Sequence, residues 1–213
     1  MVCMSSALDV ETLRPGALAR REALLDAAER AVMREGPDVS MAAIASEAGI
    51  TKPIVYRVFG DKSKLYQALA DRHTDRLLIA LRAAVFSTDD RKQRTRAVID
   101  SFLAVIDEQP EIYRFLVHRA ATDDPEVGRA VRSFIHRFGV ELGEGIAYDT
   151  GQPAGSPTAQ IWGIAMVGAV QSAAERWLDD PMGMTRSELT GALTDLFFGA
   201  YANSPQPHSR SKT

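Results

Sequence analysis

Basic side chains gather in one short stretch of the sequence, residues 50–64. This stretch contains four basic residues, Lys52, Arg57, Lys62 and Lys64, and one acidic residue, Asp61. Lysine and arginine neutralise phosphates, and both can also donate two hydrogen bonds to the guanine edge in the DNA major groove. Residues 14–64 together hold nine basic and seven acidic side chains, although the whole chain of 213 residues has a net charge of −3. A positively charged module therefore precedes an acidic remainder, which favours phosphate binding at one end of the chain.

Proline and glycine divide the chain into helical segments, and no segment reads convincingly as a strand. Apolar residues recur at helical spacing in Arg20–Glu35, and Gly36-Pro37 ends that helix. Ser40 is the expected N-cap of a short helix that ends near Ala48, and Thr51 caps the next one, which ends at Phe59. Longer helices are expected at Lys62–Phe86, 90–108, 111–121, 125–148, 158–179 and 185–201.

The two short helices and the turn at Ala48-Gly49-Ile50 have the form of a helix-turn-helix. Gly49 suits the turn because the chain must leave the first helix in a left-handed conformation, which glycine adopts at little cost. Ile44, Ala48, Ile50 and Val55 would form the small core that fixes the angle between the helices. Such a helix pair alone is a weak signal, and the charge pattern sharpens it.

The segment IASEAGITKPIVYRVFGDKSKLY resembles the DNA-binding signature of TetR-type transcriptional regulators. The matching residues are Ile44, Ala45, Ala48, Gly49, Ile50, Thr51, Tyr56, Phe59, Lys62 and Leu65. Val58 departs from the pattern, since many members carry His or Tyr there and use it on a phosphate. The resemblance implies an all-α fold, with an N-terminal three-helix helix-turn-helix DNA-binding domain followed by a larger helical ligand-binding and dimerisation bundle. The expected division is a flexible arm 1–15, the DNA-binding domain 16–64, the effector-binding and dimerisation domain 65–202, and a disordered tail 203–213.

The resemblance also implies that the helix from Thr51 to Phe59 enters the major groove. Lys52 and Arg57 are the long donors on that helix and the candidates for guanine O6 and N7. Thr51 and Tyr56 have hydroxyls suited to phosphate oxygens, which position the protein without reading sequence. Lys62 with the N-terminal amides of the following helix forms an expected anion site, and Ser40 is a further candidate phosphate contact. Pro53 and Val55 could touch a thymine methyl, although part of this segment must lie in the core.

In the family that the chain resembles, the C-terminal helices bind a small effector and pair two subunits. A mostly apolar chamber would suit a hydrophobic or acyl-type effector. The candidate lining residues are Phe102, Ile106, Tyr113, Leu116, Val117, His118, Phe134, Phe138, Trp162 and Met166. The alternative is that these residues simply fill the core of the bundle.

Two later helices could pair subunits in a two-fold, four-helix interface. Small residues at spacing four allow close helix approach, and the last helix has an apolar stripe. The candidate interface residues are Gly168, Ala169, Ser172, Leu189, Leu193, Leu196 and Phe197. The alternative is packing within one subunit.

Several other classes of protein are disfavoured. The single cysteine, Cys3, cannot form an internal disulfide, and none of the four histidines follows a glutamate at the spacing that a di-metal carboxylate bundle requires. Neither HExxH nor a glycine-rich phosphate loop occurs, so we expect no catalytic residues, metal or cofactor. The longest apolar stretch, Ile161–Val170, is about half of the ~20 residues that a membrane span needs. We therefore expect a cytoplasmic protein without a membrane partner.

The leading prediction is a homodimeric, ligand-responsive regulator that binds a pseudo-palindromic operator in double-stranded DNA. Repression relieved by the effector is the expected mode, and activation stays open. The alternatives are a helical ligand-binding protein without DNA readout and, less favoured, a helical enzyme.

Overall fold

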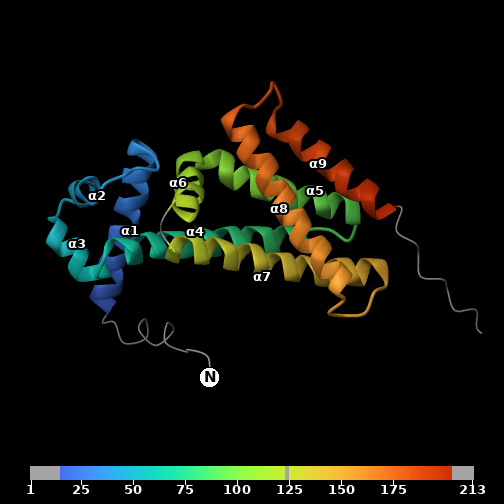
Figure 1. Ribbon diagram of the computed structural model, residues 1–213, viewed down its shortest axis with the longest axis horizontal. Helices are drawn as coiled ribbons and strands as arrows, with labels where there is room; N and C mark the ends of the chain where they lie inside the picture. The colour runs from blue at the N-terminus through green and yellow to red at the C-terminus, as the bar shows by residue number, and fades with distance from the viewer. Residues whose placement is uncertain (1–14, 123–124, 203–213) are drawn as a thin grey trace, which may run out of the picture. The chain divides into compact units, whose positions relative to one another are not determined.

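The computed structural model describes residues 15–122 and 125–202, and every regular element in these residues is an α-helix (Figure 1). The helices are α1 (Pro15–Glu35), α2 (Met41–Glu47), α3 (Lys52–Phe59), α4 (Lys62–Val85), α5 (Arg91–Glu108), α6 (Pro110–Thr122), α7 (Pro125–Thr150), α8 (Pro157–Asp179) and α9 (Arg186–Ala202). The all-α prediction is confirmed. The largest difference at a helix end is in α1, which begins at Pro15 and not at Arg20. Residues 1–14 of the predicted arm, with Cys3, and the predicted tail 203–213 lie outside the described residues.

The described helices divide into two compact units. The first contains α1–α3, the start of α4 as far as Asp71, and residues 111–128. The second contains residues 72–110, the part of α7 after residue 128, α8 and α9. The first unit thus extends past residue 64, the expected boundary, because the next turns of α4 carry Leu65, Tyr66 and Leu69, all of which are buried.

The core of the first unit follows from the apolar stripe of α1, where Leu24, Ala27 and Ala31 are buried. Ser40 and Gly49 have the expected roles, whereas Thr51 occupies the N-cap position of α3 without a capping hydrogen bond from its side chain. The Ser40 side chain accepts a hydrogen bond from the amide of Ala43, and Gly49 has a φ of +65°. These features hold α2 and α3 in contact (Figure 1).

Helix α6 packs within the first unit through aromatic and polar contacts. The buried hydroxyl of Tyr66 donates to the carbonyl of Val39 at 2.9 Å, and the ring of Tyr66 meets Phe115 edge-on at 4.9 Å. Arg119 donates to the carbonyl of Pro37 at 2.8 Å, and its guanidinium lies over the Tyr66 ring. These contacts attach α6 to the loop that joins α1 and α2.

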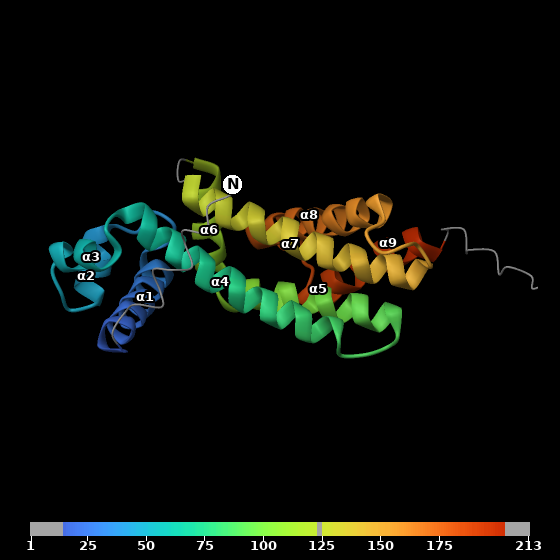
Figure 2. The same cartoon turned by 90° about the horizontal axis from the view of Figure 1, so that it is seen from below.

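In the second unit, α7 and α8 lie side by side (Figure 2), and the residues at their contact are glycines, which have no side chain to separate the two backbones. A Cβ atom on Gly163 would lie 2.1 Å from the carbonyl oxygen of Gly139 and 2.7 Å from the nitrogen of Gly143. The two backbones are therefore in direct contact. Gly163 therefore serves packing between α7 and α8 within the subunit.

Helices α5 and α9 form the other seam of the second unit. Three residues of the apolar α9 stripe are buried: Leu189, Leu193 and Phe197. The chain itself covers most of the surface of these three predicted interface residues, which leaves little of it for a second copy of the chain. At the edge of this seam, Arg186 forms 3.3 Å ion pairs with Asp100 and Asp107 of α5.

No helix in the described ranges has both the length and the apolar character needed to cross a membrane.

Candidate nucleic-acid interface and ligand cavity

Helix α3 has one buried and one exposed side, and the exposed side carries the predicted DNA contacts. Val55 and Phe59 are buried. The side chains that point to solvent are those of Thr51, Lys52, Pro53, Tyr56 and Arg57. An eight-residue helix is about 12 Å long and, with side chains, ~10–12 Å wide, which suits a major groove ~12 Å wide. The structure therefore brings five of the predicted DNA-contacting residues together on one accessible surface.

Val55 is corrected as a DNA contact. Its exposed fraction is 0%, so it packs in the small core with Ile44 and has no surface to offer a thymine methyl. The helical period places Val55 and Phe59 one turn apart on the inner side. Pro53 is exposed and is the apolar residue of this pair that a base could reach.

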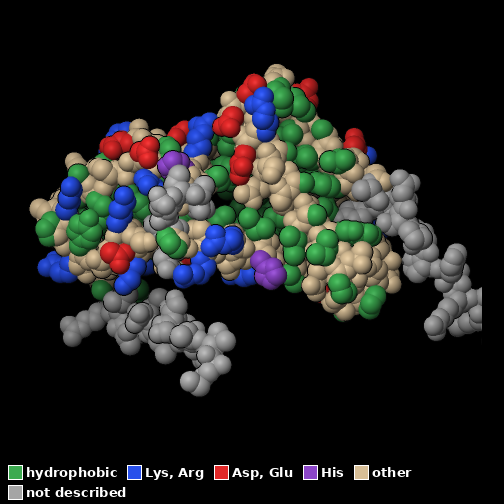
Figure 3. Space-filling view, viewed as in Figure 1, with side chains coloured by type: hydrophobic (Ala, Val, Ile, Leu, Met, Phe, Trp, Pro, Cys, Tyr) green, Lys and Arg blue, Asp and Glu red, His purple; other side chains and the backbone are tan. Residues whose placement is uncertain are grey.

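The basic residues of the first unit differ in whether acids neutralise them. Arg30 and Arg34 both donate to the carboxylate of Glu47, and these hydrogen bonds lower the pKa of Glu47 below its ordinary value. Lys52 and Arg57 form no ion pair within the described ranges. Their charges therefore stay available to an external anion. Figure 3 shows basic side chains, in blue, among hydrophobic ones over the part that carries α1–α3.

The two remaining predicted phosphate contacts lie at helix starts. Ser40 is exposed, and since its oxygen accepts the N-cap hydrogen bond, its hydroxyl proton can still be donated outward. Lys62 is exposed at the start of α4, with its Nζ 5.3 Å from the centre of the Tyr66 ring. The Asp61 carboxylate already accepts the amide of Lys64 at 2.8 Å. The predicted anion site therefore relies on the Lys62 side chain more than on the helix amides.

A cavity of about 780 Å³ lies within the second unit, a volume typical of small-molecule sites, which span ~300–1,000 Å³. Helices α4, α5, α7, α8 and α9 all contribute to its wall. Its apolar lining includes the stacked rings of Phe134 and Phe138, whose centroids are 6.2 Å apart. Further apolar lining residues are Leu81, Val85, Val98, Ile99, Phe102, Leu142, Ile146, Met166, Val167, Val170 and Phe198.

Four of the ten predicted chamber residues line this cavity: Phe102, Phe134, Phe138 and Met166. The other six do not line it. Ile106 is buried elsewhere in the second unit, and Trp162 packs on the cluster of Ile146, Ala147 and Ala159. The remaining four, Tyr113, Leu116, Val117 and His118, belong to α6 in the first unit.

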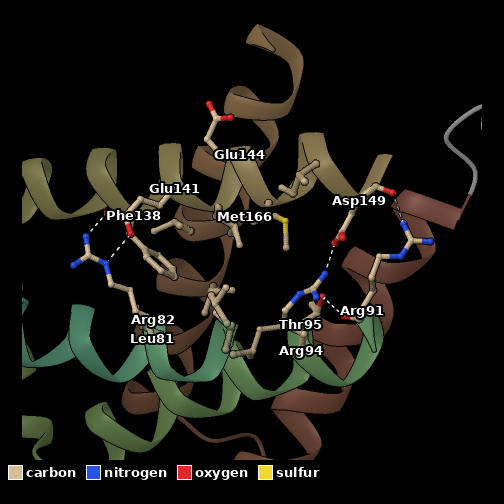
Figure 4. A pocket seen from close by; sticks show the side chains of 18 of the residues that line it. Leu81, Arg82, Arg91, Arg94, Thr95, Phe138, Glu141, Glu144, Asp149 and Met166 are labelled. Atoms are coloured by element: carbon tan, nitrogen blue, oxygen red, sulfur yellow. Dashed lines mark hydrogen bonds and ion pairs between the residues drawn. The ribbon is translucent and has the colours of Figure 1, made fainter. Parts of the chain in front are cut away.

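Charged residues at the two ends of the cavity were missed by sequence reasoning (Figure 4). At one end, Arg82 of α4 donates to both oxygens of Glu141 of α7, with its Nε 2.8 Å from Oε2. This hydrogen bonding lowers the pKa of Glu141 below its ordinary value. At the other end, Arg94 of α5 pairs with the Asp149 carboxylate, and Arg91 donates to the Asp149 backbone carbonyl at 3.0 Å. The sequence does show charged residues in the helices expected at 90–108 and 125–148, but it does not show which of them form ion pairs.

Among the described residues, no group of three or more His, Cys, Asp or Glu side chains is placed to hold a metal ion.

Comparison with known families gives matches over both units. Residues 24–69 match the family described as "Bacterial regulatory proteins, tetR family". Residues 80–212 match the family described as "Tetracyclin repressor-like, C-terminal domain". The second match alone spans more than half of the chain.

Among curated proteins, an uncharacterized HTH-type transcriptional regulator of Mycobacterium tuberculosis is 34% identical over 185 residues, 85% of this chain and 76% of that protein. The HTH-type transcriptional activator FasR of Mycolicibacterium smegmatis is 26% identical, over 89% of this chain and 86% of its own. The HTH-type nicotine-responsive transcriptional repressor HdnoR of Paenarthrobacter nicotinovorans is 24% identical, over 87% and 97%. The names of these relatives describe transcriptional regulators and not enzymes.

Solved structures share the fold. A TetR-like transcriptional regulator from Rhodococcus sp. RHA1 aligns with a TM-score of 0.66 at 25% identity, over 87% of this chain and 97% of its own. A second transcriptional regulator from Rhodococcus aligns with a TM-score of 0.73 at 19% identity, over 89% and 99%. Together with the family matches, these likenesses establish that the chain belongs to the TetR family of DNA-binding transcriptional regulators.

Proposed function

We propose that the protein is a cytoplasmic repressor that binds a pseudo-palindromic operator as a homodimer and is released by a small, largely hydrophobic effector. The observation that carries the DNA-binding part is the exposed side of α3, where Lys52 and Arg57 form no ion pair with any described residue and Tyr56 is 40% exposed. A side chain already engaged by an acid would have to be released before it could bind DNA, whereas these are available at no such cost.

Dimerisation supplies the second half-site contact. Helix-turn-helix dimers bind half-sites one helical turn, ~34–36 Å, apart. Candidate pairing residues that the chain leaves accessible are Ala169 and Ser172 on α8 and Leu196 on α9, with Gly168 half-buried beside them. Leu196 is 62% exposed, and Ile161 on α8 is 64% exposed. Apolar side chains exposed on neighbouring helices support an interface with a second copy of the chain.

The cavity supports control by a ligand. Its wall is mostly apolar between two ends that carry charged side chains, and it lies in the unit that follows the DNA-binding helices. The relative HdnoR is named nicotine-responsive, which supports control of this chain by a small molecule as well. Relatives named as an activator and as a repressor both occur. Repression is the simpler mode. An effector that favours the conformation unable to fit the operator releases the protein from DNA, and relief of repression then needs no contact with another protein.

The test is binding of the full-length protein to pooled genomic fragments, comparing wild type with Arg57→Ala and Tyr56→Ala. If Arg57 reads guanine, Arg57→Ala relaxes one base position in each half-site and loses about 1–3 kcal/mol of discrimination there. If Tyr56 holds a phosphate, Tyr56→Ala weakens binding to all sequences alike. Arg132→Ala is the matched control, because it removes an exposed arginine from α7 and leaves α3 unchanged.

Specific DNA binding by this protein must weaken as salt rises, because each phosphate contact releases counterions. Enrichment of a short palindrome by wild type and by Arg132→Ala, with the two distinct effects above, supports the proposal. Absence of any enriched fragment at low salt, with or without cell extract, refutes it. Repression is then tested with a reporter gene behind the enriched sequence, where expression should rise when the regulator is deleted.

A further inference from the structure

The cavity of the second unit has two chemically different ends. Figure 4 shows the Arg82–Glu141 pair at one end, Arg94 and Arg91 beside Asp149 at the other, and apolar side chains between them. At the first end the charges balance, since the guanidinium of Arg82 donates hydrogen bonds to both carboxylate oxygens of Glu141. The second end contains two guanidinium groups and one carboxylate.

Among the described residues, no carboxylate pairs with the exposed guanidinium of Arg91 at this second end. Asp149 pairs with Arg94, and the hydrogen bond of Arg91 goes to a backbone carbonyl. Glu144 also borders the cavity, but it accepts the amide of Gly155 and points away from the interior in Figure 4. The described lining as a whole has three arginines and three carboxylates, and since Glu144 points away from the interior, three arginines and two carboxylates remain at the two ends.

We propose that the cavity binds an amphipathic monoanion, with its carboxylate at Arg91 and Arg94 and its hydrocarbon chain along the apolar wall that includes Phe138. This inference rests on the proposed function, because it names the class of effector that the same cavity takes. A guanidinium has five N–H donors, of which the described hydrogen bonds use one on Arg91 and one on Arg94. Carboxylates accept such donors in short, charge-assisted hydrogen bonds.

Asp149 competes with the ligand in this arrangement. Its carboxylate occupies one donor of Arg94, and both side chains are only partly exposed. A second carboxylate beside Asp149 meets a like charge at short range, which opposes its binding. Replacing Asp149 with asparagine keeps the shape of the side chain and removes that charge, so the affinity for an anionic ligand should rise.

The hydrocarbon part of the ligand is bound through the apolar surface area that it buries in the cavity. Apolar residues from five helices line the space between the two charged ends. Each methylene moved from water into such surroundings contributes ~0.8 kcal/mol, which corresponds to about a fourfold gain in affinity. Affinity should therefore rise with chain length until the chain reaches the Arg82–Glu141 end.

The experiment measures binding of four probes to the full-length protein by calorimetry, with dodecanol below its solubility limit and the ionic probes below their micelle concentrations. Dodecanoate, dodecanol and dodecyltrimethylammonium share one chain and differ in charge, and octanoate shortens the chain. We expect dodecanoate to bind at least about tenfold tighter than dodecanol, since a hydrogen bond to a charged group contributes ~1.5–3 kcal/mol. Octanoate should bind much more weakly than dodecanoate.

Variants assign the charged end. Arg91→Ala should reduce dodecanoate affinity about tenfold and leave dodecanol unchanged, and Arg91→Lys should restore part of the loss. Asp149→Asn should tighten dodecanoate several-fold. Arg132→Ala, which changes an arginine outside the lining, should match wild type. Thermal unfolding of each variant shows whether it is folded, and the unchanged dodecanol affinity provides a second check.

Equal binding of dodecanoate and dodecanol overturns the proposal, as does tighter binding of the ammonium, which would assign the carboxylates as the ligand-binding groups. No effect of Arg91→Ala on dodecanoate also overturns it. These failures leave operator enrichment untouched. If the regulator proposal were wrong, the protein would show no specific DNA binding but could still prefer a carboxylate ligand. The two outcomes are therefore distinguishable.

Discussion

Replacing Gly163 with alanine tests the backbone contact between α7 and α8. The added Cβ would lie 2.1 Å from the Gly139 carbonyl oxygen, whereas ordinary contact begins at about 3.4 Å, so α8 would have to shift by about 1.3 Å. The nearest obstacles are backbone atoms of Gly139 and Gly143. No side-chain rotation can relieve the clash, and the two helices must separate.

The magnitude follows from two opposed effects. Overfilling a packed region costs ~1–3 kcal/mol, and an obstacle made of backbone places this case at the upper limit. Alanine in a helix gains up to ~1 kcal/mol over glycine. The net loss is about 2 kcal/mol, which corresponds to a Tm lowered by ~4–8 °C for a chain of this size.

Gly145→Ala is the matched control, because it makes the same substitution within α7 where nothing lies within 4 Å of the added Cβ. It should raise Tm by ~2–4 °C through helix propensity alone. Both variants are compared with wild type by thermal unfolding followed by far-UV circular dichroism, at one protein concentration because an oligomer's Tm depends on it. Equal Tm shifts in the two variants would refute the close crossing of α7 and α8.

Three further predictions use other contacts. Tyr66→Phe removes the buried hydrogen bond to the Val39 carbonyl and should cost about 1–2 kcal/mol, seen as a Tm lowered by ~2–8 °C, whereas Tyr148→Phe, at a site 88% exposed, should leave Tm unchanged. Because the pKa of Glu141 is lowered by Arg82, its contribution to stability is complete above the ordinary glutamate pKa of ~4.3 and is lost as the pH falls through the lowered value. The Tm difference between wild type and Glu141→Gln should therefore be largest near neutral pH and shrink in acid; a difference that grows in acid would contradict this assignment. Leu196→Arg should shift the sedimentation of the protein from dimer to monomer, whereas Ile79→Arg, at a similarly exposed apolar site on α4, should not.

The exposed surface of α3, the candidate DNA-binding surface, could be predicted because its signals are local. Ser40 and Gly49 stand at the ends of short helices, where capping and turn chemistry restrict the residue types. The period of α3 then separates Lys52 and Arg57 from the buried side. Val55 was misassigned because an apolar residue in an eight-residue helix can serve either side, and only the packed core decides between them.

The cavity could be predicted only in part because its signals are not local. Phe102 and Phe134 look the same in the sequence whether they fill a core or line a hollow, and the difference depends on how the helices pack. The charged ends depend on pairs separated by 59 residues for Arg82–Glu141 and 55 for Arg94–Asp149. Periodicity within one helix carries no information on such pairs.

Helix α6 shows a further limit of local patterns. Tyr113 and His118 follow the cavity-lining helix α5 closely in the chain, which made them plausible chamber residues. Their helix instead belongs to the first unit, where Arg119 and Phe115 contact Tyr66 and the α1–α2 loop. Contacts made by one arginine and two aromatic rings decide this placement, and they leave no periodic pattern in the sequence.

Helix α4 has residues in both units, so the proposed ligand binding and the DNA binding share one helix. Helix α4 begins at Lys62, holds Tyr66 in the first unit, and carries Arg82 at the cavity of the second. A ligand shifts DNA affinity only by its difference in affinity for the two conformations, and this coupling is reciprocal. If a carboxylate lowers operator affinity by some factor, the operator must lower carboxylate affinity by that same factor. Unequal factors at equilibrium would mean that the two ligands do not act on one linked pair of conformations.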